Sequence, residues 1–281
     1  MVFTPSSEQL CFFMGPKMKK FAVIFAIAVA GLLQTSSTAS AQNLTVTIES
    51  LQPTGGFFFT PVWNSLHDGN FDLFDVGQDV SGGTGLQVLA ETGNTAVLSG
   101  EFAGSGIDQT IIGPDGDAAG PFDPGESASQ TFNNVDTTTN RFFSFASMII
   151  PSNDAFVGNG NPLAYEIFDA NGDFIFGNGT IDVFASDIYD AGTEVNNING
   201  GAAFSANGGD RADEGGSVQL IDLADLNDFV GTDTVAGPSI TQALTPDSPV
   251  FRISFTNAVP EPGSMSVLAL VGGAFFMRRR R

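Results

Sequence analysis

The apolar run FFSFASMII, at Phe142–Ile150, is the sequence feature that most constrains the fold. Successive side chains of a strand point to opposite faces of a sheet, and both alternating sets are largely apolar here. The aromatic and β-branched residues favour a strand over a buried helix. Because Pro151 has no N–H to give to a neighbouring strand, pairing should stop there. The run therefore predicts a strand buried on both faces, near the middle of a sheet.

Other segments carry weaker strand patterns. Leu44–Ile48 and Phe251–Phe255 alternate apolar and polar residues, which is typical of half-buried strands. Ser127–Phe132 is expected to be a strand that returns toward the core. Tyr165–Phe176 predicts a hairpin, because the Asn-Gly pair in its middle is a strong short turn signal.

The remaining central segments predict loops and short helices. Gly104–Gly125 and Asn196–Gly216 are rich in Gly, Asn and Asp, and we expect loops there. Leu86–Glu91 predicts one short helical turn that ends at Gly93. In Leu220–Val230 aspartates recur at intervals of three, which indicates a short amphipathic helix with an acidic, solvated face.

Charge is the most informative part of the composition. Between Gln42 and Met277, three arginines and no lysine stand against 30 carboxylates, a formal charge of −27. Nucleic acid is therefore not expected as a partner, since phosphate binding needs a basic surface. Such a surface suits divalent cations, and it equally suits a protein that only has to stay soluble. Cys11 is the one cysteine, so no disulfide is expected.

The amino-terminal residues have the pattern of a secretory signal. Basic Met18–Lys20 precedes the apolar segment Phe21–Leu33, and Ala39–Ala41 supplies a small-residue cleavage site. We expect residues 1–41 to be an upstream extension and a signal peptide, which leaves Gln42 as the first mature residue. The competing interpretation is a permanent membrane helix, which the short apolar run disfavours.

The carboxyl end combines a Pro-Glu-Pro motif, the apolar segment Ser264–Met277 and the basic tail Arg278–Arg281. Residues 259–281 thus resemble the PEP-CTERM sorting signal. The apolar segment is shorter than the roughly 20 residues that span a bilayer. The resemblance implies export through the inner membrane, transient membrane insertion of the tail and processing by an exosortase-type enzyme. The protein would then be released or attached at the cell surface or in the extracellular matrix. A plain membrane anchor remains the alternative.

Three stretches, in the expected order, resemble the spondin N-terminal domain family. SMIIPSNDAFVG, at Ser147–Gly158, resembles the core motif of the family. FTPVWNSLHDGNFDLFDVG, at Phe59–Gly77, resembles the amino-terminal motif of bacterial spondin-like proteins, and YDAGTE, at Tyr189–Glu194, resembles the family's Asp-Ala-Gly-Thr-Asp loop. The resemblance implies an all-β fold, a single antiparallel β-sandwich over residues 42–258 with long acidic Gly-rich loops.

The resemblance also implies one bound Ca²⁺ ion between two loops. The positions that match the family's ligands are Asp154, Asp190 and Glu194. Glu194 departs from the family pattern, which has Asp there, and the extra methylene changes the reach of the carboxylate. Calcium takes six to eight oxygen ligands, which carboxylates, loop carbonyls and water can supply. Gly192 would let the loop bend so that two carboxylates four residues apart converge.

No stretch predicts a catalytic site. His67 is the only histidine, and Asp68 is its neighbour in the chain. Adjacent residues rarely adopt the geometry of a Ser-His-Asp triad, and the sequence has no nucleophile-elbow motif. We therefore expect His67 to have a loop or packing role.

The sequence as a whole predicts a non-enzymatic, exported surface or extracellular-matrix module, stabilised by calcium. The family implies adhesion, through binding to exopolysaccharide or to surface proteins. One alternative is an exported glycan-active hydrolase that uses paired carboxylates, although no pair stands out in the sequence. Another is a structural component of the matrix that has no specific ligand.

Overall fold

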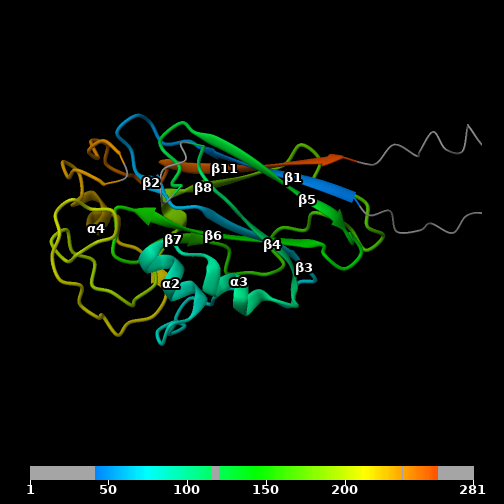
Figure 1. Cartoon of the computed structure of the whole chain (residues 1–281), viewed down its shortest axis with the longest axis horizontal. Helices are drawn as coiled ribbons and strands as arrows, with labels where there is room; N and C mark the ends of the chain where they lie inside the picture. The colour runs from blue at the N-terminus through cyan, green and yellow to red at the C-terminus, as the bar shows by residue number, and fades with distance from the viewer. Residues whose placement is uncertain (1–41, 115–119, 236, 259–281) are drawn as a thin grey trace, which may run out of the picture. The chain divides into compact units, whose positions relative to one another are not determined.

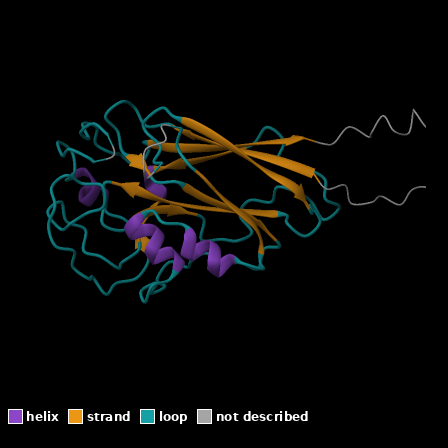
Figure 2. Ribbon diagram, viewed as in Figure 1, coloured by secondary structure: helices purple, strands orange, loops and turns teal. Residues whose placement is uncertain are grey.

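The computed structural model describes residues 42–114, 120–235 and 237–258. The chain divides into two units, Met1–Thr38 and Ala39–Arg281, and all described residues belong to the second. These residues form two antiparallel β-sheets packed face to face, with two helices against one sheet (Figures 1 and 2). The predicted all-β sandwich is therefore confirmed.

Both predicted targeting segments lie outside the described residues, so the signal peptide and the sorting tail stay predictions. Within the described residues, no helix is long and apolar enough to cross a membrane.

The four-stranded sheet pairs the first and last strands of the described chain. Its strands, in spatial order, are β5 (Ser127–Val135), β1 (Gln42–Ser50), β11 (Pro249–Ala258) and β8 (Thr180–Phe184). β1 and β11 pair along nearly their whole length, so the two ends of the described chain lie side by side. The alternating apolar residues of Leu44–Ile48 and Phe251–Phe255 are buried, as the pattern of each segment predicts.

The apolar run at Phe142–Ile150 forms β6, inside the seven-stranded sheet. The strand order is β10 (Gln219–Leu220), β9 (Ile188–Asp190), β7 (Ala155–Gly158), β6 (Phe142–Ile150), β3 (Val62–His67) and β4 (Gly106–Ile111), and β2 (Phe58–Phe59) also pairs with β6. Every residue of β6 after Phe142 is buried, and the strand ends before Pro151. The prediction of a strand buried on both faces is therefore confirmed.

Phenylalanine fills much of the space between the two sheets. Phe59 of β2 stacks on Phe122, with ring centroids 4.8 Å apart, and lies 4.9 Å from the ring of Phe251 in β11. Phe143 of β6 meets Phe255 of β11 edge to face, at 4.9 Å. These aromatic contacts join one sheet to the other.

Two helices, α2 (Gly85–Thr92) and α3 (Ala96–Phe102), pack on the outer side of the seven-stranded sheet, where their apolar residues join a second buried cluster. The Thr84 hydroxyl caps α2 by accepting a hydrogen bond from a backbone N–H of the first turn. Gly93 ends the helix in the left-handed conformation, with φ of 71°. The predicted helix and its end at Gly93 are confirmed, although the helix has eight residues and is longer than the single turn expected.

The prediction of a loop throughout Gly104–Gly125 is wrong for its first part. Gly106–Ile111 forms β4, which pairs with β3 at the edge of the sheet. Most side chains of β4 are only half-buried, so the segment lacks the clear apolar alternation of a buried strand. Its pairing partner, not its own sequence, makes it a strand.

Two other elements are smaller than predicted. In Tyr165–Phe176 the turn is present, and its arms pair through a single bridge between Phe168 and Phe174 with flanking backbone hydrogen bonds, too short a pairing to form two strands. The helix predicted at Leu220–Val230 is confined to α4 (Leu223–Asn227). Asp222 serves there as the N-cap, since its carboxylate accepts from the N–H of Ala224 at 2.9 Å. Between β8 and β9, the chain makes a 3-10 turn, η1 (Ala185–Asp187).

Candidate metal centre

The ends of two neighbouring strands bring the three predicted calcium ligands together. Asp154 directly precedes β7, Asp190 ends β9, and the two strands pair with Ala155 opposite Asp190. Glu194 follows in the next loop, and its backbone N–H donates to Asp154 Oδ2 at 3.0 Å. All three acidic residues are buried.

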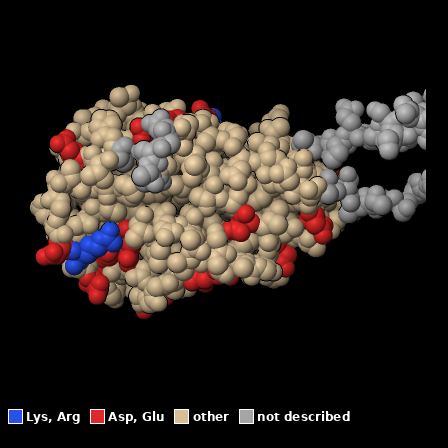
Figure 3. Space-filling model, in the orientation of Figure 1, with Lys and Arg blue, Asp and Glu red and all other residues tan. Residues whose placement is uncertain are grey.

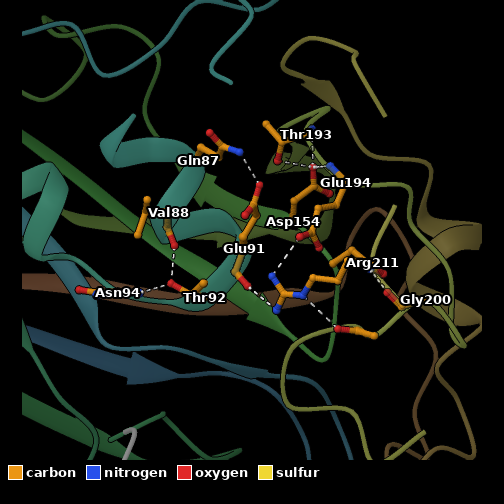
Figure 4. Close-up of polar contacts among 12 residues, drawn as sticks. Gln87, Val88, Glu91, Thr92, Asn94, Asp154, Thr193, Glu194, Gly200 and Arg211 are labelled. Atoms are coloured by element: carbon orange, nitrogen blue, oxygen red, sulfur yellow. Dashed lines mark hydrogen bonds and ion pairs between the residues drawn. The ribbon is translucent and has the colours of Figure 1, made fainter. Parts of the chain in front are cut away.

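Asp154 is fully buried and ties the two loops together (Figure 4). Its Oδ2 accepts hydrogen bonds from the N–H and the hydroxyl of Thr193, at 2.8 and 3.1 Å, besides the one from Glu194. Its Oδ1 accepts from Nδ2 of Asn196 at 3.3 Å. Burial and the charge of Asp190 raise the pKa of Asp154 to about 7, although the hydrogen bonds lower it. The carboxylate is thus well anchored, but in the described chain no ion pair compensates its charge.

Gly192 makes the bend between Asp190 and Glu194 possible. Its N–H donates to Asp190 Oδ1 at 2.7 Å, and its φ is 69°. A Cβ at this position would lie 2.4 Å from the backbone nitrogen of Ser217. Glycine is therefore needed both for the left-handed backbone and for the close approach of the next segment. The bend that the sequence predicts at Gly192 is present.

The side chain of Glu194 has a partner that sequence reasoning missed. Arg211 Nη1 donates to Glu194 Oε1 at 3.0 Å (Figure 4). The same guanidinium donates to the backbone oxygens of Glu91 and Gly201, each at 3.3 Å. Glu91 lies in the last turn of α2, where a cation is favourable. Arg211 thereby connects that helix to the two loops.

Glu194 and Asn196, which both donate a hydrogen bond to Asp154, each have one buried oxygen without a hydrogen-bond partner among the described residues: Glu194 Oε2 and Asn196 Oδ1. Burial raises the pKa of Glu194, and Arg211 opposes that rise. Carboxylate and amide oxygens are the ligands that calcium prefers. A cation would satisfy such atoms and offset the repulsion between Asp154 and Asp190. The donor chemistry therefore fits calcium.

The arrangement of these donors is incomplete. In the part of the chain that the structure describes, no three His, Cys, Asp or Glu side chains are grouped so that they could hold a metal ion. Asp154 and Asp190 are close enough to influence each other's charge, whereas Arg211 holds one oxygen of Glu194. Binding of an ion by all three carboxylates would require the Glu194 side chain to shift.

A groove of about 340 Å³ opens beside Asp190, lined by Asn196 and by three further carboxylates, those of Glu214, Asp222 and Asp225. Burial and the charge of Asp190 raise the pKa of Glu214. Burial raises the pKa of Asp225 as well, and the charges of Asp222 and Asp190 add to that rise. The aspartates that the sequence assigns only to a solvated helix face thus border a route by which a cation could reach Asp190 from solvent.

His67 belongs to a buried hydrogen-bond network inside the seven-stranded sheet. Its Nδ1 accepts from the N–H of Gly69 at 3.0 Å, which assigns the ring proton to Nε2. Nε2 therefore donates to Ser144 Oγ at 2.9 Å, and Asn159 Nδ2 donates to the same oxygen at 3.1 Å. A triad histidine must instead accept the serine proton. Asp68 is exposed and bonds to Asn70, so His67 has the packing geometry expected of it.

The burial of His67 predicts that this side chain destabilises the folded state in mild acid. Burial lowers its pKa below the ordinary value of 6.5, although Asp68 raises it. The folded state therefore prefers the neutral ring, and below about pH 6.5 the unfolded chain takes up the proton first. Protonation of Asp154, whose pKa is about 7, stabilises the folded state over the same pH range, so the effect of His67 is measured as the difference between wild type and His67→Gln. Urea unfolding at about pH 7.5 and about pH 5.5 gives the change in the free energy of unfolding for each protein. As the pH falls, this change should be less favourable to folding in wild type than in His67→Gln, and an equal change in both proteins would contradict the prediction.

The chain is thus a β-sandwich in which three buried carboxylates lie at or near the ends of two neighbouring strands. The Spondin_N family model matches residues 52–204, which is more than half of the chain and includes Asp154, Asp190 and Glu194. The chain therefore belongs to the Spondin_N family, and this membership indicates an extracellular or secreted module. No curated protein matches the chain. Arg211 lies outside the matched residues.

Proposed function

We propose that this protein is an exported, non-enzymatic surface or extracellular-matrix module, stabilised by calcium, that mediates adhesion by binding exopolysaccharide or surface proteins. Family membership supports the extracellular setting. The excess of carboxylates over arginines supports a partner other than nucleic acid, and Figure 3 shows several separate patches of Asp and Glu side chains on one face of the domain. The observation that carries the calcium part is the buried, mutually repelling pair Asp154 and Asp190.

One calcium ion would be held by Asp154 and Asp190, with Glu194 Oε2 and Asn196 Oδ1 as further oxygens. The two unpartnered oxygens support this donor set. The ion would bridge the loop before β7 and the loop after β9, and binding to the folded state alone would stabilise it by mass action. Loops fixed in this way can present a binding surface on the rigid sandwich.

Arg211→Gln tests whether Glu194 is a calcium ligand. Without calcium, the variant should lose about 1 kcal/mol of stability, because Glu194 keeps a buried carboxylate without its ion pair. Its affinity for calcium should rise several-fold, since the guanidinium no longer competes for Glu194. Arg141→Gln, which removes the ion pair to Glu166 on another loop, should leave calcium affinity unchanged. Equal affinities in wild type and Arg211→Gln would remove Glu194 from the donor set.

The targeting part of the proposal rests on the sequence patterns of residues 1–41 and 259–281. A cleaved signal would deliver the chain across the inner membrane, and an exosortase-type enzyme would process the tail after its transient insertion in the membrane. Mass spectrometry of the exported protein tests both steps. It should find Gln42 at the amino end and no Arg278–Arg281 tail.

Binding to polymer is tested with immobilised exopolysaccharide from the producing cells. The purified protein should be retained in calcium, and retention should fall when a chelator is added. Asp154→Asn should be retained weakly both in calcium and in the chelator. If the wild-type protein is not retained in either condition, polymer binding is wrong, and a surface protein or a purely structural role takes its place.

Three observations favour binding over glycan hydrolysis. A general acid for hydrolysis needs a raised pKa at a position that substrate can reach. Asp154 has the raised pKa but is fully buried. Asp182 lines an open cleft, but its hydrogen bonds to Arg252 lower its pKa. Glu214 and Asp225 combine a raised pKa with an open groove, but no aromatic ring of the described residues lines that groove to hold a sugar.

A further inference from the structure

A second, separate cleft of about 380 Å³ lies between β8, the edge strand of the four-stranded sheet, and the β6, β7 and β9 strands of the other sheet. Its volume is within the range of about 300–1,000 Å³ typical of small-molecule sites. Aromatic rings, carboxylates and asparagines line it together. The candidate metal centre does not use these residues.

Both tyrosines of the chain line this cleft. The protein has 27 Phe but only two Tyr, Tyr165 and Tyr189. Apart from Trp63, the buried aromatic rings of the two core clusters are phenylalanines, and a ring with a hydroxyl occurs only in this cleft. Neither hydroxyl has a hydrogen-bond partner among the described residues, and both residues are partly exposed. The hydroxyls are therefore free to bond to a ligand in the cleft.

Both tyrosine rings pack against phenylalanine rings of the domain. Tyr189 of β9 packs edge to face with Phe74 at 4.9 Å and stacks on Phe156 at 5.6 Å. Tyr165 lies 6.2 Å from the ring of Phe145 in β6. Rings fixed in this way lose little conformational freedom when a ligand binds.

Gly160 allows this wall of the cleft to form. A Cβ at this position would lie 2.9 Å from the backbone oxygen of Phe74 and 3.0 Å from Cε2 of its ring. The side chain of the neighbouring Asn159 is held by hydrogen bonds within the fold: its Oδ1 accepts from the N–H of Phe145 at 2.9 Å, and its Nδ2 donates to Ser144 Oγ at 3.1 Å. The wall is thus a close-packed, fixed surface.

The carboxylates of the cleft are oriented acceptors. Asp182 of β8 is held by Arg252, with N–O distances of 2.6 and 3.0 Å. Asp187 accepts from the N–H of Phe184 through Oδ2 at 2.9 Å, which leaves its other oxygen available. No Lys or Arg lines the cleft among the described residues, which disfavours phosphate or uronic-acid ligands. Acceptors beside aromatic rings suit a ligand that has many hydroxyl donors and apolar C–H faces.

We propose that this cleft binds one or two pyranose units of a neutral polysaccharide, with Tyr165, Tyr189 and Asp187 as the principal contacts. The sugar hydroxyls would donate to Asp187 and exchange hydrogen bonds with the tyrosine hydroxyls, while the ring faces pack on Tyr189 and Phe74. A quaternary ammonium ion is the other class that tyrosines and a carboxylate bind. Such a cation is usually surrounded by several aromatic rings that form a cage, whereas Tyr165 and Tyr189 make no ring contact with each other. The inference rests on the proposed function as a polymer-binding module.

Because the chain has only two tyrosines, ring-labelled tyrosine gives an NMR probe that reports on this cleft alone. Tyr165→Phe and Tyr189→Phe assign the two sets of signals. The purified protein is titrated with glucose, galactose, mannose and N-acetylglucosamine, and with disaccharides of each. At least one of these sugars should shift both sets of signals in a saturable manner.

The variants then test the contacts. Each Tyr→Phe change should weaken binding of that sugar about two- to tenfold, which corresponds to one hydrogen bond. Asp187→Asn should weaken it similarly, whereas Asp173→Asn, an exposed carboxylate in the Asn-Gly turn, should leave it unchanged.

Two results would overturn the inference: no neutral sugar shifts the tyrosine signals, or tetramethylammonium shifts them when no sugar does. The retention assay on immobilised exopolysaccharide separates this failure from that of the proposed function. Retention that persists while both tyrosine signals stay unmoved would place the polymer elsewhere on the module. If the protein is not retained on exopolysaccharide and no sugar shifts the tyrosine signals, the proposed polymer binding is wrong.

Discussion

Replacing Phe59 with alanine is expected to lower the free energy of unfolding by about 3–5 kcal/mol, the usual effect of removing a buried aromatic ring. Phe59 is fully buried, and its ring lies between those of Phe122 and Phe251. It belongs to the strand pair β2–β6, whereas Phe251 belongs to β11 in the other sheet. The variant therefore loses contacts that join the two sheets, and it leaves a cavity between them. Urea unfolding measures the loss.

Phe184→Ala is the matched control. Phe184 lies at the end of β8 and is 37% exposed, so its loss should cost about 1 kcal/mol or less. If the two variants lose the same amount, the interface between the sheets does not depend on Phe59 as described.

Calcium is expected to raise the free energy of unfolding by about 2.7 kcal/mol when its concentration is 100 times Kd. For a domain of this size, the thermal midpoint should rise by about 5–11 °C. The reason is that the ion would compensate two buried carboxylates, Asp154 and Asp190, that now repel each other. Thermal unfolding in calcium and in a chelator measures the shift.

Asp154→Asn should abolish this shift without unfolding the protein. The amide oxygen can still accept from the N–H groups of Thr193 and Glu194. Asn196 can turn its amide so that its unpartnered oxygen accepts from the new NH₂ group. Asp173→Asn should respond to calcium as the wild type does. A shift of equal size in Asp154→Asn would contradict the assigned site.

The buried strands could be predicted because their patterns are local. The apolar run at β6 and the alternation in β1 and β11 follow from which faces are buried, and each element appears where the pattern placed it. β4 could not be predicted, since its half-exposed side chains have no such pattern and its strand geometry comes from pairing with β3.

The site could be predicted only in part. The motifs around Asp154 and Tyr189–Glu194 identify the two loops, and strand pairing brings them together. Arg211 and Asn196 lie in or beside the loop Asn196–Gly216, whose path depends on contacts with distant segments, so no local pattern points to them. The one available signal for Arg211 was its rarity, as one of three basic residues between Gln42 and Met277.

Calorimetric titration of calcium into the purified, chelator-treated protein is the most direct test of the proposed calcium site. About one ion per chain should bind saturably, and Asp154→Asn should lose that binding. Absence of saturable binding by the wild-type protein at millimolar calcium, or undiminished binding by Asp154→Asn, would contradict the proposed site.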